Sequence, residues 1–314
     1  MLKGERGPLR PWRRQRPAAA SALAAACLAL ASPPAAAQQP AAPAPEGMVS
    51  IAGFAAPESV LIDRPRGVIY VANINGAPGE ADDNGFISRI SLDDLSVETH
   101  WIDGADDDVR LDAPKGMALT PDGFLLVSDI DRLRAFRIET GEPAAMLEMA
   151  DATFLNDLWF QDGTLYVSDS GGVDRPGRVL AVDADGGVAI VAEGADLARP
   201  NGVAVDGAGR LLVATLDAAR ILAIAEDGTI SVVANLPAGR LDGLVALADG
   251  SLLVSSWEAG AIFRVTADGQ VVTLADGLAS PADIDAEIGA DSASSLLAIP
   301  LLTEDRVIVM PLPE

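Results

Sequence analysis

A polar residue stands at the start of a short apolar segment five times in this chain, at nearly constant spacing. We call these residues the repeat markers: Glu58, Lys115, Asn156, Asn201 and Asp242, separated by 57, 41, 45 and 41 residues. A sixth, degenerate copy, Pro281-Ala282-Asp283-Ile284, follows about one step later. Equivalent positions of a repeat occupy equivalent places in space. If the repeats close into a ring, the marker side chains therefore converge on one axis.

Each marker opens the same series of segments. A run rich in Val, Ile, Leu and Ala comes first, a turn with Asp-Gly or Gly follows, and three more apolar runs complete the unit. In the third repeat the expected strands are 157–160, 164–169, 178–184 and 188–192. Four short strands per unit of about 40–45 residues are typical of a β-propeller blade. The sequence therefore predicts an all-β fold, a six-bladed β-propeller with four strands per blade.

The first and last repeats differ from the others. The first contains an insert rich in Gly, Asp and Asn at residues 73–85. The last offers only three strands, at 283–287, 295–300 and 306–310, while an additional strand is available at 48–54. We expect this N-terminal strand to complete the last blade, which closes the ring and covers a sheet edge. The propeller is thus predicted to span residues 48–314 as one domain.

The N-terminal region has the composition of a targeting segment. Residues 1–37 combine a basic start with the apolar run 18–31 and the sequence Ala35-Ala36-Ala37. This pattern predicts a secretory signal peptide, followed by an extended linker at 38–47. Arg13-Arg14 leaves a twin-arginine signal open, although the residues after it fit that motif poorly. We expect a periplasmic or secreted protein that does not insert into the membrane after cleavage and that has no cysteine.

Acidic residues dominate the composition. The formal net charge is −24, and because residues 1–37 contribute +5, the remainder carries −29. Such a charge disfavours nucleic acid and anionic membrane surfaces as partners. It is explained by solubility, or by a field that attracts cations. Lys115 is the only lysine and His100 the only histidine outside the predicted signal peptide.

Four of the repeat markers form a plausible set of metal ligands. Glu58 and Asp242 offer carboxylates, and Asn156 and Asn201 offer amide oxygens. Hard cations such as Ca²⁺ prefer six to eight oxygen ligands and tolerate irregular geometry. The absence of nearby His and Cys argues against zinc, copper and iron. The alternative is that these side chains only cap turns, as Asn and Asp often do.

These residues carry a resemblance to a known family. The chain resembles the senescence-marker-protein, gluconolactonase and luciferin-regenerating-enzyme family of six-bladed propellers, across residues 48–314. The matching motifs are Glu58, Leu155-Asn156-Asp157, Pro200-Asn201-Gly202 and Leu241-Asp242-Gly243. In that family these positions bind a divalent cation, so the resemblance implies that Glu58, Asn156, Asn201 and Asp242 bind Ca²⁺.

The resemblance also implies an activity, the hydrolysis of lactones or esters. A cation in the channel would polarise the carbonyl group of a small-molecule substrate. A carboxylate beside it can activate water or attack directly, and we assign this catalytic role to Asp242. The second strand of each unit returns to the marker face. We therefore expect Asp169 and Trp257 to contact the substrate there.

Three positions depart from the family pattern. Phe154 stands where gluconolactonase-type members carry an arginine, which favours a less polar substrate and makes Phe154 a candidate for binding it. Lys115 occupies the second marker, where it could bind a substrate oxyanion and act catalytically, balance nearby carboxylates, or weaken or replace the metal. His100 lies in an expected outer strand and is interpreted as structural. Asp283, which is offset by one residue from the markers, is a lesser candidate for the site.

Two other functions compete with a monomeric hydrolase. A non-catalytic propeller would use the marker face to bind a peptide or a small molecule. A propeller similar to strictosidine synthase would join substrates without a metal, but no clear equivalent of its glutamate is present. The ordered Glu-Asn-Asn-Asp set favours the hydrolase, because a binding propeller has no need of it.

Overall fold

The computed structural model describes residues 47–289 and 295–313. The predicted signal peptide and nearly all of the linker lie outside this range. Within it the chain forms six sheets of four antiparallel strands. The helical elements here are two short 3-10 turns, η1 (Arg64–Arg66) and η2 (Ala195–Leu197). No helix in these residues has the length and apolar character needed to cross a membrane.

Each of the first three blades is one continuous stretch of chain. Blade 1 contains β2 (Pro57–Asp63), β3 (Val68–Asn73), β4 (Phe86–Ser91) and β5 (Val97–Asp103). Blade 2 contains β6 (Pro114–Leu119), β7 (Phe124–Asp129), β8 (Arg132–Arg137) and β9 (Pro143–Glu148). Blade 3 contains β10 (Leu155–Gln161), β11 (Thr164–Asp169), β12 (Arg178–Val182) and β13 (Val188–Glu193).

The next two blades repeat this order, and the last one differs. Blade 4 contains β14 (Pro200–Val205), β15 (Leu211–Thr215), β16 (Arg220–Ile224) and β17 (Ile230–Asn235). Blade 5 contains β18 (Leu241–Ala246), β19 (Leu252–Ser256), β20 (Ala261–Val265) and β21 (Val271–Ala275). Blade 6 contains β22 (Asp285–Glu287), β23 (Leu296–Leu301), β24 (Arg306–Pro311) and β1 (Val49–Ala52).

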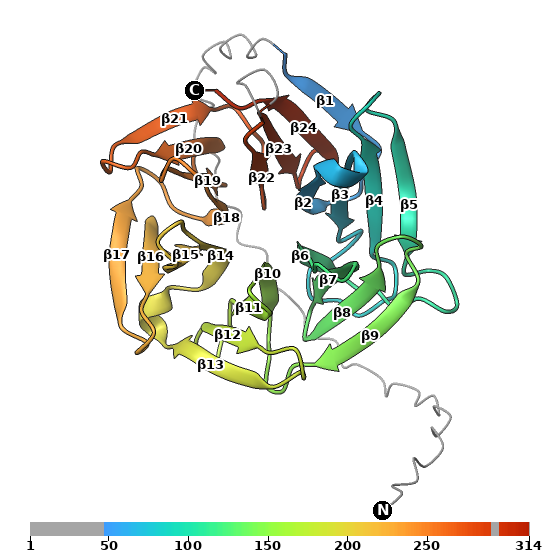
Figure 1. Cartoon of the computed structure of the whole chain (residues 1–314), viewed down its shortest axis with the longest axis horizontal. Coiled ribbons are helices and arrows are strands. Elements are labelled where there is room, and N and C mark those ends of the chain that lie inside the picture. Colours follow the sequence, from blue (N-terminus) through green and yellow to red (C-terminus); the bar gives the residue numbers. More distant parts are fainter. Residues whose placement is uncertain (1–46, 290–294, 314) are drawn as a thin grey trace, which may run out of the picture. The chain divides into compact units, whose positions relative to one another are not determined.

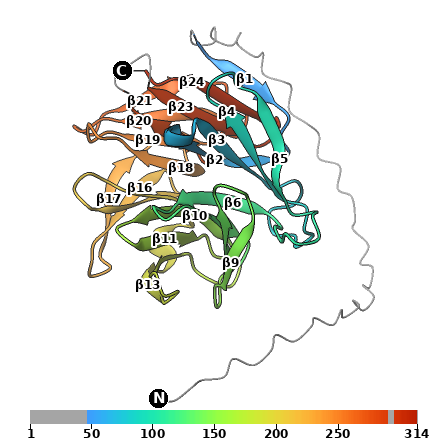
Figure 2. The same ribbon diagram turned by 45° about the vertical axis from the view of Figure 1, so that its right-hand side comes forward.

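The sheets are arranged around a central axis, with the first strand of every blade innermost (Figure 1). Seen obliquely, the strands of each blade lie side by side from the centre outwards (Figure 2). Most residues of the innermost strands are buried, such as Leu241 to Val245 in β18. Fourth strands such as β13 bury few residues because they form the outer edge.

Closure of the ring follows the prediction. β1 pairs with β24 in antiparallel register, with Val49 opposite Val309. On the inner side, the backbone N–H of Asp283 donates to the carbonyl oxygen of Glu58 at 2.8 Å, which joins blades 6 and 1 directly. β22 begins later than expected because Asp283 bridges to Ser59 of the neighbouring blade instead of pairing within its own.

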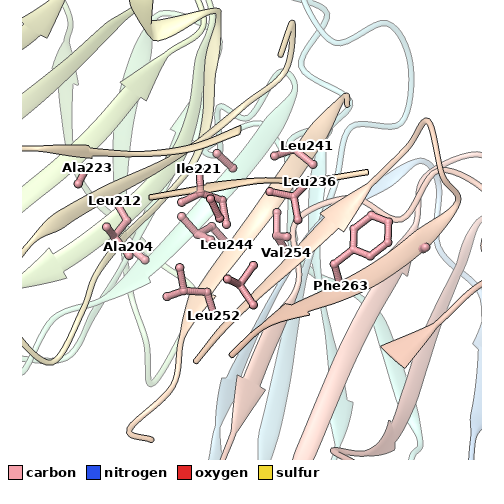
Figure 3. Packing of buried hydrophobic residues seen from close by; sticks show 14 residues of the cluster. Ala204, Leu212, Ile221, Ala223, Leu236, Leu241, Leu244, Leu252, Val254 and Phe263 are labelled. Atoms are coloured by element: carbon pink, nitrogen blue, oxygen red, sulfur yellow. The ribbon is translucent and has the colours of Figure 1, made fainter. Parts of the chain in front are cut away.

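The hydrophobic core is divided between the blades. Each of six buried clusters draws its residues from two neighbouring blades. Figure 3 shows the cluster between blades 4 and 5, where Leu212 and Ile221 face Leu244 and Val254. Burying these aliphatic side chains stabilises the interface by roughly 25 cal/mol per Å² of apolar surface. The packing holds neighbouring blades together and so fixes the positions of their inner strands.

Candidate functional site

A β-bulge accompanies the marker in every one of blades 1 to 5. The pairing of the first two strands shifts register between the residue before the marker and a residue shortly after it, for example between Leu241 and Leu244. A bulge frees one residue from the ladder and redirects its side chain. The repeated bulge therefore gives the markers a common position at the start of the innermost strand.

Glycines beside three markers allow the inner strands to approach one another closely. A Cβ atom on Gly243 would lie 2.3 Å from the backbone nitrogen of Ile284, and one on Gly202 would lie 2.3 Å from the carbonyl oxygen of Asp242. Gly116 has a similar clash with Asp157 at 2.5 Å. A glycine directly after the marker is therefore needed for the close approach of neighbouring inner strands, and not only for a turn.

A regular hydrogen bond places the residue two before the marker on the same face. Its carbonyl oxygen accepts from the residue that follows the second strand, as in Ser170 to Phe154 at 2.9 Å and Trp257 to Arg240 at 3.1 Å. Blades 1, 4 and 6 repeat this bond. The second strand therefore returns to the marker face, as the topology predicted.

The four predicted ligands are buried and carry oxygen atoms without hydrogen-bond partners. The exposed fractions of Glu58, Asn156, Asn201 and Asp242 are 4%, 4%, 3% and 0%. The unpartnered atoms are Glu58 Oε2, Asn156 Oδ1, Asn201 Oδ1, Asp242 Oδ1 and Asp242 Oδ2. Buried polar atoms in proteins are nearly always hydrogen-bonded, so this group requires an explanation. The atoms are all oxygens of the kind that Ca²⁺ prefers, and a bound cation fits them.

Burial sets the ionisation of the two carboxyl groups. It raises the pKa of Glu58 to about 8, with Lys115 opposing the rise and Asp157 adding to it. Burial, with repulsion from Glu58 and Asp157, also raises the pKa of Asp242 far above its usual value. The Trp257 indole and the Asn201 amide act against this rise, but neither reaches the carboxylate with regular hydrogen-bond geometry. A cation would favour the charged form of both groups.

Lys115 shares this buried position, with an exposed fraction of 1%. Its Nζ donates to the carbonyl oxygen of Ala113 at 3.0 Å and lies 4.5 Å from the centre of the Phe154 ring. Burial lowers the pKa of Lys115, while Glu58 and Asp129 oppose the change. It takes part in none of the ion pairs among residues 47–289 and 295–313. Lys115 thus brings a positive charge to the ring without neutralising one particular carboxylate.

Asp169 is engaged by the protein itself. Its carboxylate accepts from Phe154 N at 2.9 Å and Gly171 N at 3.1 Å, and from Arg178 at 2.7 Å. Although burial acts to raise the pKa of Asp169, these donors hold it below the usual value. Asp169 therefore positions Phe154 against Lys115, and little of its carboxylate is left for a substrate because it is 1% exposed.

Trp257 lies half-buried on the marker face, just after β19. The guanidinium of Arg240 stacks 5.4 Å from its ring centre. The Trp257 indole nitrogen is buried and has no regular hydrogen-bond partner. Phe154 and Trp257 are thus both aromatic platforms for a cation beside the markers.

A second layer of carboxylates contains Asp283, which the sequence offered as a lesser candidate, and Asp157, which the sequence did not single out. Asp157 and Asp283 both occupy the position one after the marker, where three other repeats have Gly. Both line a cavity of about 150 Å³ that is bounded mainly by apolar residues of the inner strands. Burial raises the pKa of Asp157 to about 7, and Asp157 interacts with Asp283. The available sequence signal was the position of these residues, because Asp283 and Asp157 each stand one residue after the marker position.

The part of the chain that the structure describes contains no second candidate metal site built from His, Cys, Asp and Glu. No group of three or more His, Cys, Asp or Glu side chains there is placed to hold a metal ion. The candidate site therefore depends on the two Asn oxygens as well as on two carboxylates. His100 lies in the outer strand β5, where it contacts Asp103 at 2.8 Å and stacks on Phe86 at 4.2 Å.

Solved structures share the fold with this chain. A putative gluconolactonase is 18% identical, with 85% of this chain and 93% of that one covered, at a TM-score of 0.64. Regucalcin from Agrobacterium tumefaciens, described as a calcium-binding protein, is 16% identical over 82% and 90%, at 0.62. Virginiamycin B lyase from Staphylococcus aureus is 14% identical over 85% and 99%, at 0.59.

No protein-family model matches the sequence, and no curated protein matches it. At identities this low, the structural similarities show the fold alone. The chain is thus similar to propellers of several activities, including a gluconolactonase-like protein, a calcium-binding protein and a lyase.

Proposed function

We propose that this protein is an exported, calcium-dependent hydrolase of lactones or esters. The observation that supports the proposal is the group of five unpartnered oxygen atoms on Glu58, Asn156, Asn201 and Asp242. These four residues would hold the cation. When bound, it would supply a Lewis acid that polarises the carbonyl group of the substrate.

The chain's own residues would carry out the remaining steps. Asp242 is the candidate general base or nucleophile, because both of its carboxylate oxygens lack partners. Lys115 uses one of its three donors on Ala113, which leaves the others for an oxyanion. Phe154, held by Asp169, would form an apolar wall for the substrate. The products are the carboxylic acid and the alcohol, or the hydroxy acid of a lactone.

A panel of lactones and aryl esters tests this proposal. We expect hydrolysis that a chelator abolishes and that added calcium restores. Asp242→Asn should lower kcat/KM by about a hundredfold or more, the scale of losing one catalytic acid or base. Asp162→Asn is the matched control, because Asp162 lies in an exposed turn between β10 and β11. Activity that is indifferent to chelator would rule out metal-assisted hydrolysis.

The burial of the site favours one alternative, a cation that only stabilises the ring of a binding propeller. The markers are 0–4% exposed, so a substrate has limited access to them. In that case calcium would raise the Tm, and Asp242→Asn would abolish this rise. No member of the panel would be hydrolysed at any calcium concentration.

A further inference from the structure

We propose that Arg240, stacked on Trp257, binds an anionic group of the substrate, and that the preferred substrate is an ester or lactone carrying a carboxylate. This inference rests on the proposed function for the reacting bond. It adds a second recognition point on the opposite side of the ring from Lys115. Blade 5, which carries Arg240, and blade 2, which carries Lys115, are three blades apart in a ring of six.

Arg240 occupies a defined place beside the candidate site. It stands two residues before Asp242, the position that Phe154 takes relative to Asn156. In both blades the carbonyl oxygen at this position accepts from the residue after the second strand. Phe154 contacts the buried Lys115, which shows that this position reaches the marker ring. Arg240 therefore lies beside Asp242 on the face where the second strands end.

The guanidinium of Arg240 is held in place but not neutralised. It lies 5.4 Å from the Trp257 ring centre, which limits its freedom by a cation–π contact. None of the ion pairs in the described part of the chain includes Arg240. The nearby Glu258 instead accepts from the backbone N–H of Gly239 at 2.6 Å. Arg240 is exposed, so its donors remain available to a ligand.

The equivalent arginine in blade 4 differs in this respect. Arg199 stands two residues before Asn201 and shares the left-handed backbone of Arg240, with φ values of 57° and 51°. Arg199, however, pairs with Asp217 at 3.6 Å and has no aromatic platform among the described contacts. Arg199 and Arg240 thus occupy equivalent positions in neighbouring blades, and of the two only Arg240 lacks a carboxylate partner.

Because the protein is strongly acidic, an arginine without an acidic partner beside the candidate site points to an anionic ligand. The chain carries 46 acidic side chains against 22 basic ones, and its field repels anions. An uncompensated arginine beside the candidate site would provide a local attraction for a carboxylate, which guanidinium groups bind with two parallel hydrogen bonds. Phe154 would face the apolar part of a substrate, and Arg240 would fix the orientation of its charged end.

Two esters with the same leaving group test the inference. The probes are para-nitrophenyl hexanoate and the mono-para-nitrophenyl ester of adipic acid, which differ in their terminal carboxylate. We expect wild-type kcat/KM to be about tenfold or more higher for the adipate ester, the scale of one charge-assisted contact. Arg240→Gln should remove this preference, and Arg240→Lys should restore part of it.

Arg306→Gln is the matched control. Arg306 is exposed and forms no ion pair in the described residues, and its contact is with Ser50 in blade 6. Arg306→Gln removes the same charge as Arg240→Gln. A preference that depended on net charge alone would therefore fall equally in these two variants. Equal hydrolysis of the two esters by the wild type would overturn the inference while leaving the proposed function intact.

A binding measurement separates the inference from the activity. Phenylphosphonate should change the tryptophan emission of the wild type in a saturable manner, because it would bind beside Trp257. The signal should disappear in Arg240→Gln and in Trp257→Phe but persist in Arg306→Gln. If neither ester is hydrolysed but this pattern is found, the proposed function fails and the anion site stands. No saturable change in the wild type would overturn the anion site.

Discussion

Buried charges at single residues determine how the candidate site behaves. Glu58 and Asp242 lie together with Lys115, and all three are at most 4% exposed. Removing charges from water is costly unless they are paired or bound to a cation. Lys115 supplies only one positive charge, and it opposes the rise in the pKa of Glu58 without forming an ion pair. A divalent cation would complete the compensation.

Replacing Lys115 tests whether it competes with the cation. Lys115→Met keeps an unbranched side chain of similar size but removes the charge, and with it the cation–π contact with Phe154. We expect calcium to bind about tenfold more tightly, roughly 1.4 kcal/mol, because a repelling charge is lost from the ring. Calorimetric titration measures the difference. Weaker binding in Lys115→Met would instead show that the amine supports the site.

The sequence predicted the residues of the candidate site for a physical reason. A marker in a strict repeat has its position fixed by the fold, so Glu58, Asn156, Asn201 and Asp242 could be grouped without a structure. The burial of these side chains could not be predicted in this way. The hydrogen bonds that Asp169 accepts from Arg178 and from backbone N–H groups could not be predicted either. Those contacts depend on how neighbouring loops pack, which the repeat does not encode.

At the scale of the strand, the bulges and glycines of the inner strands bring the blades together. Gly116, Gly202 and Gly243 each lie against the backbone of the next blade at distances that exclude a Cβ atom. The strand order and turn positions were predictable from apolar periodicity and Asp-Gly turns. The bulges were not, because register depends on the pairing of two strands rather than on either sequence alone.

Substituting one of these glycines should loosen the ring. Gly243→Ala places a Cβ atom 2.3 Å from the Ile284 nitrogen and 2.7 Å from Asp283 Oδ1. We expect a loss of about 1–3 kcal/mol in the free energy of unfolding, the usual cost of overpacking. Chemical denaturation measures it. Gly207→Ala is the control, because nothing lies within 4 Å of its Cβ position and its φ is not positive. Equal stability of the two variants would contradict this description of the channel.

At the scale of the whole molecule, the ring collects several buried acids on one axis. Burial raises the pKa of Glu58 to about 8, of Asp157 to about 7 and of Asp285 to about 6. Between about pH 4 and pH 8 the folded chain therefore binds more protons than the unfolded chain. Stability consequently falls as pH rises through this range. Lys115, whose pKa is lowered by burial, acts in the opposite direction.

This linkage predicts a pH dependence that calcium should reverse. In chelator, the Tm should fall between about pH 5 and pH 8, because the buried carboxyl groups ionise without compensation. Calcium should raise the Tm most near pH 8, where its ligands are ionised. Glu58→Gln should make the fall in chelator shallower. A Tm that rises with pH in chelator would show that these carboxyl groups are already compensated in the folded protein.

Closure of the ring was also predictable at this scale. A last repeat lacking one strand, and an unassigned strand near the N-terminus, left one arrangement that covers the open edge. In the second layer, Asp283 was a lesser candidate, and Asp157 was not singled out because Gly occupies the equivalent position in three repeats.

Calorimetric titration of the protein with calcium tests the central claim most directly. The account predicts one site with a Kd of about 1 mM or tighter, in the range of extracellular calcium modules. Asp242→Asn should abolish the binding, and Asp162→Asn, which removes the same charge from an exposed turn, should leave it unchanged. An absence of binding at millimolar calcium, or equal binding by Asp242→Asn and wild type, would contradict the metal site.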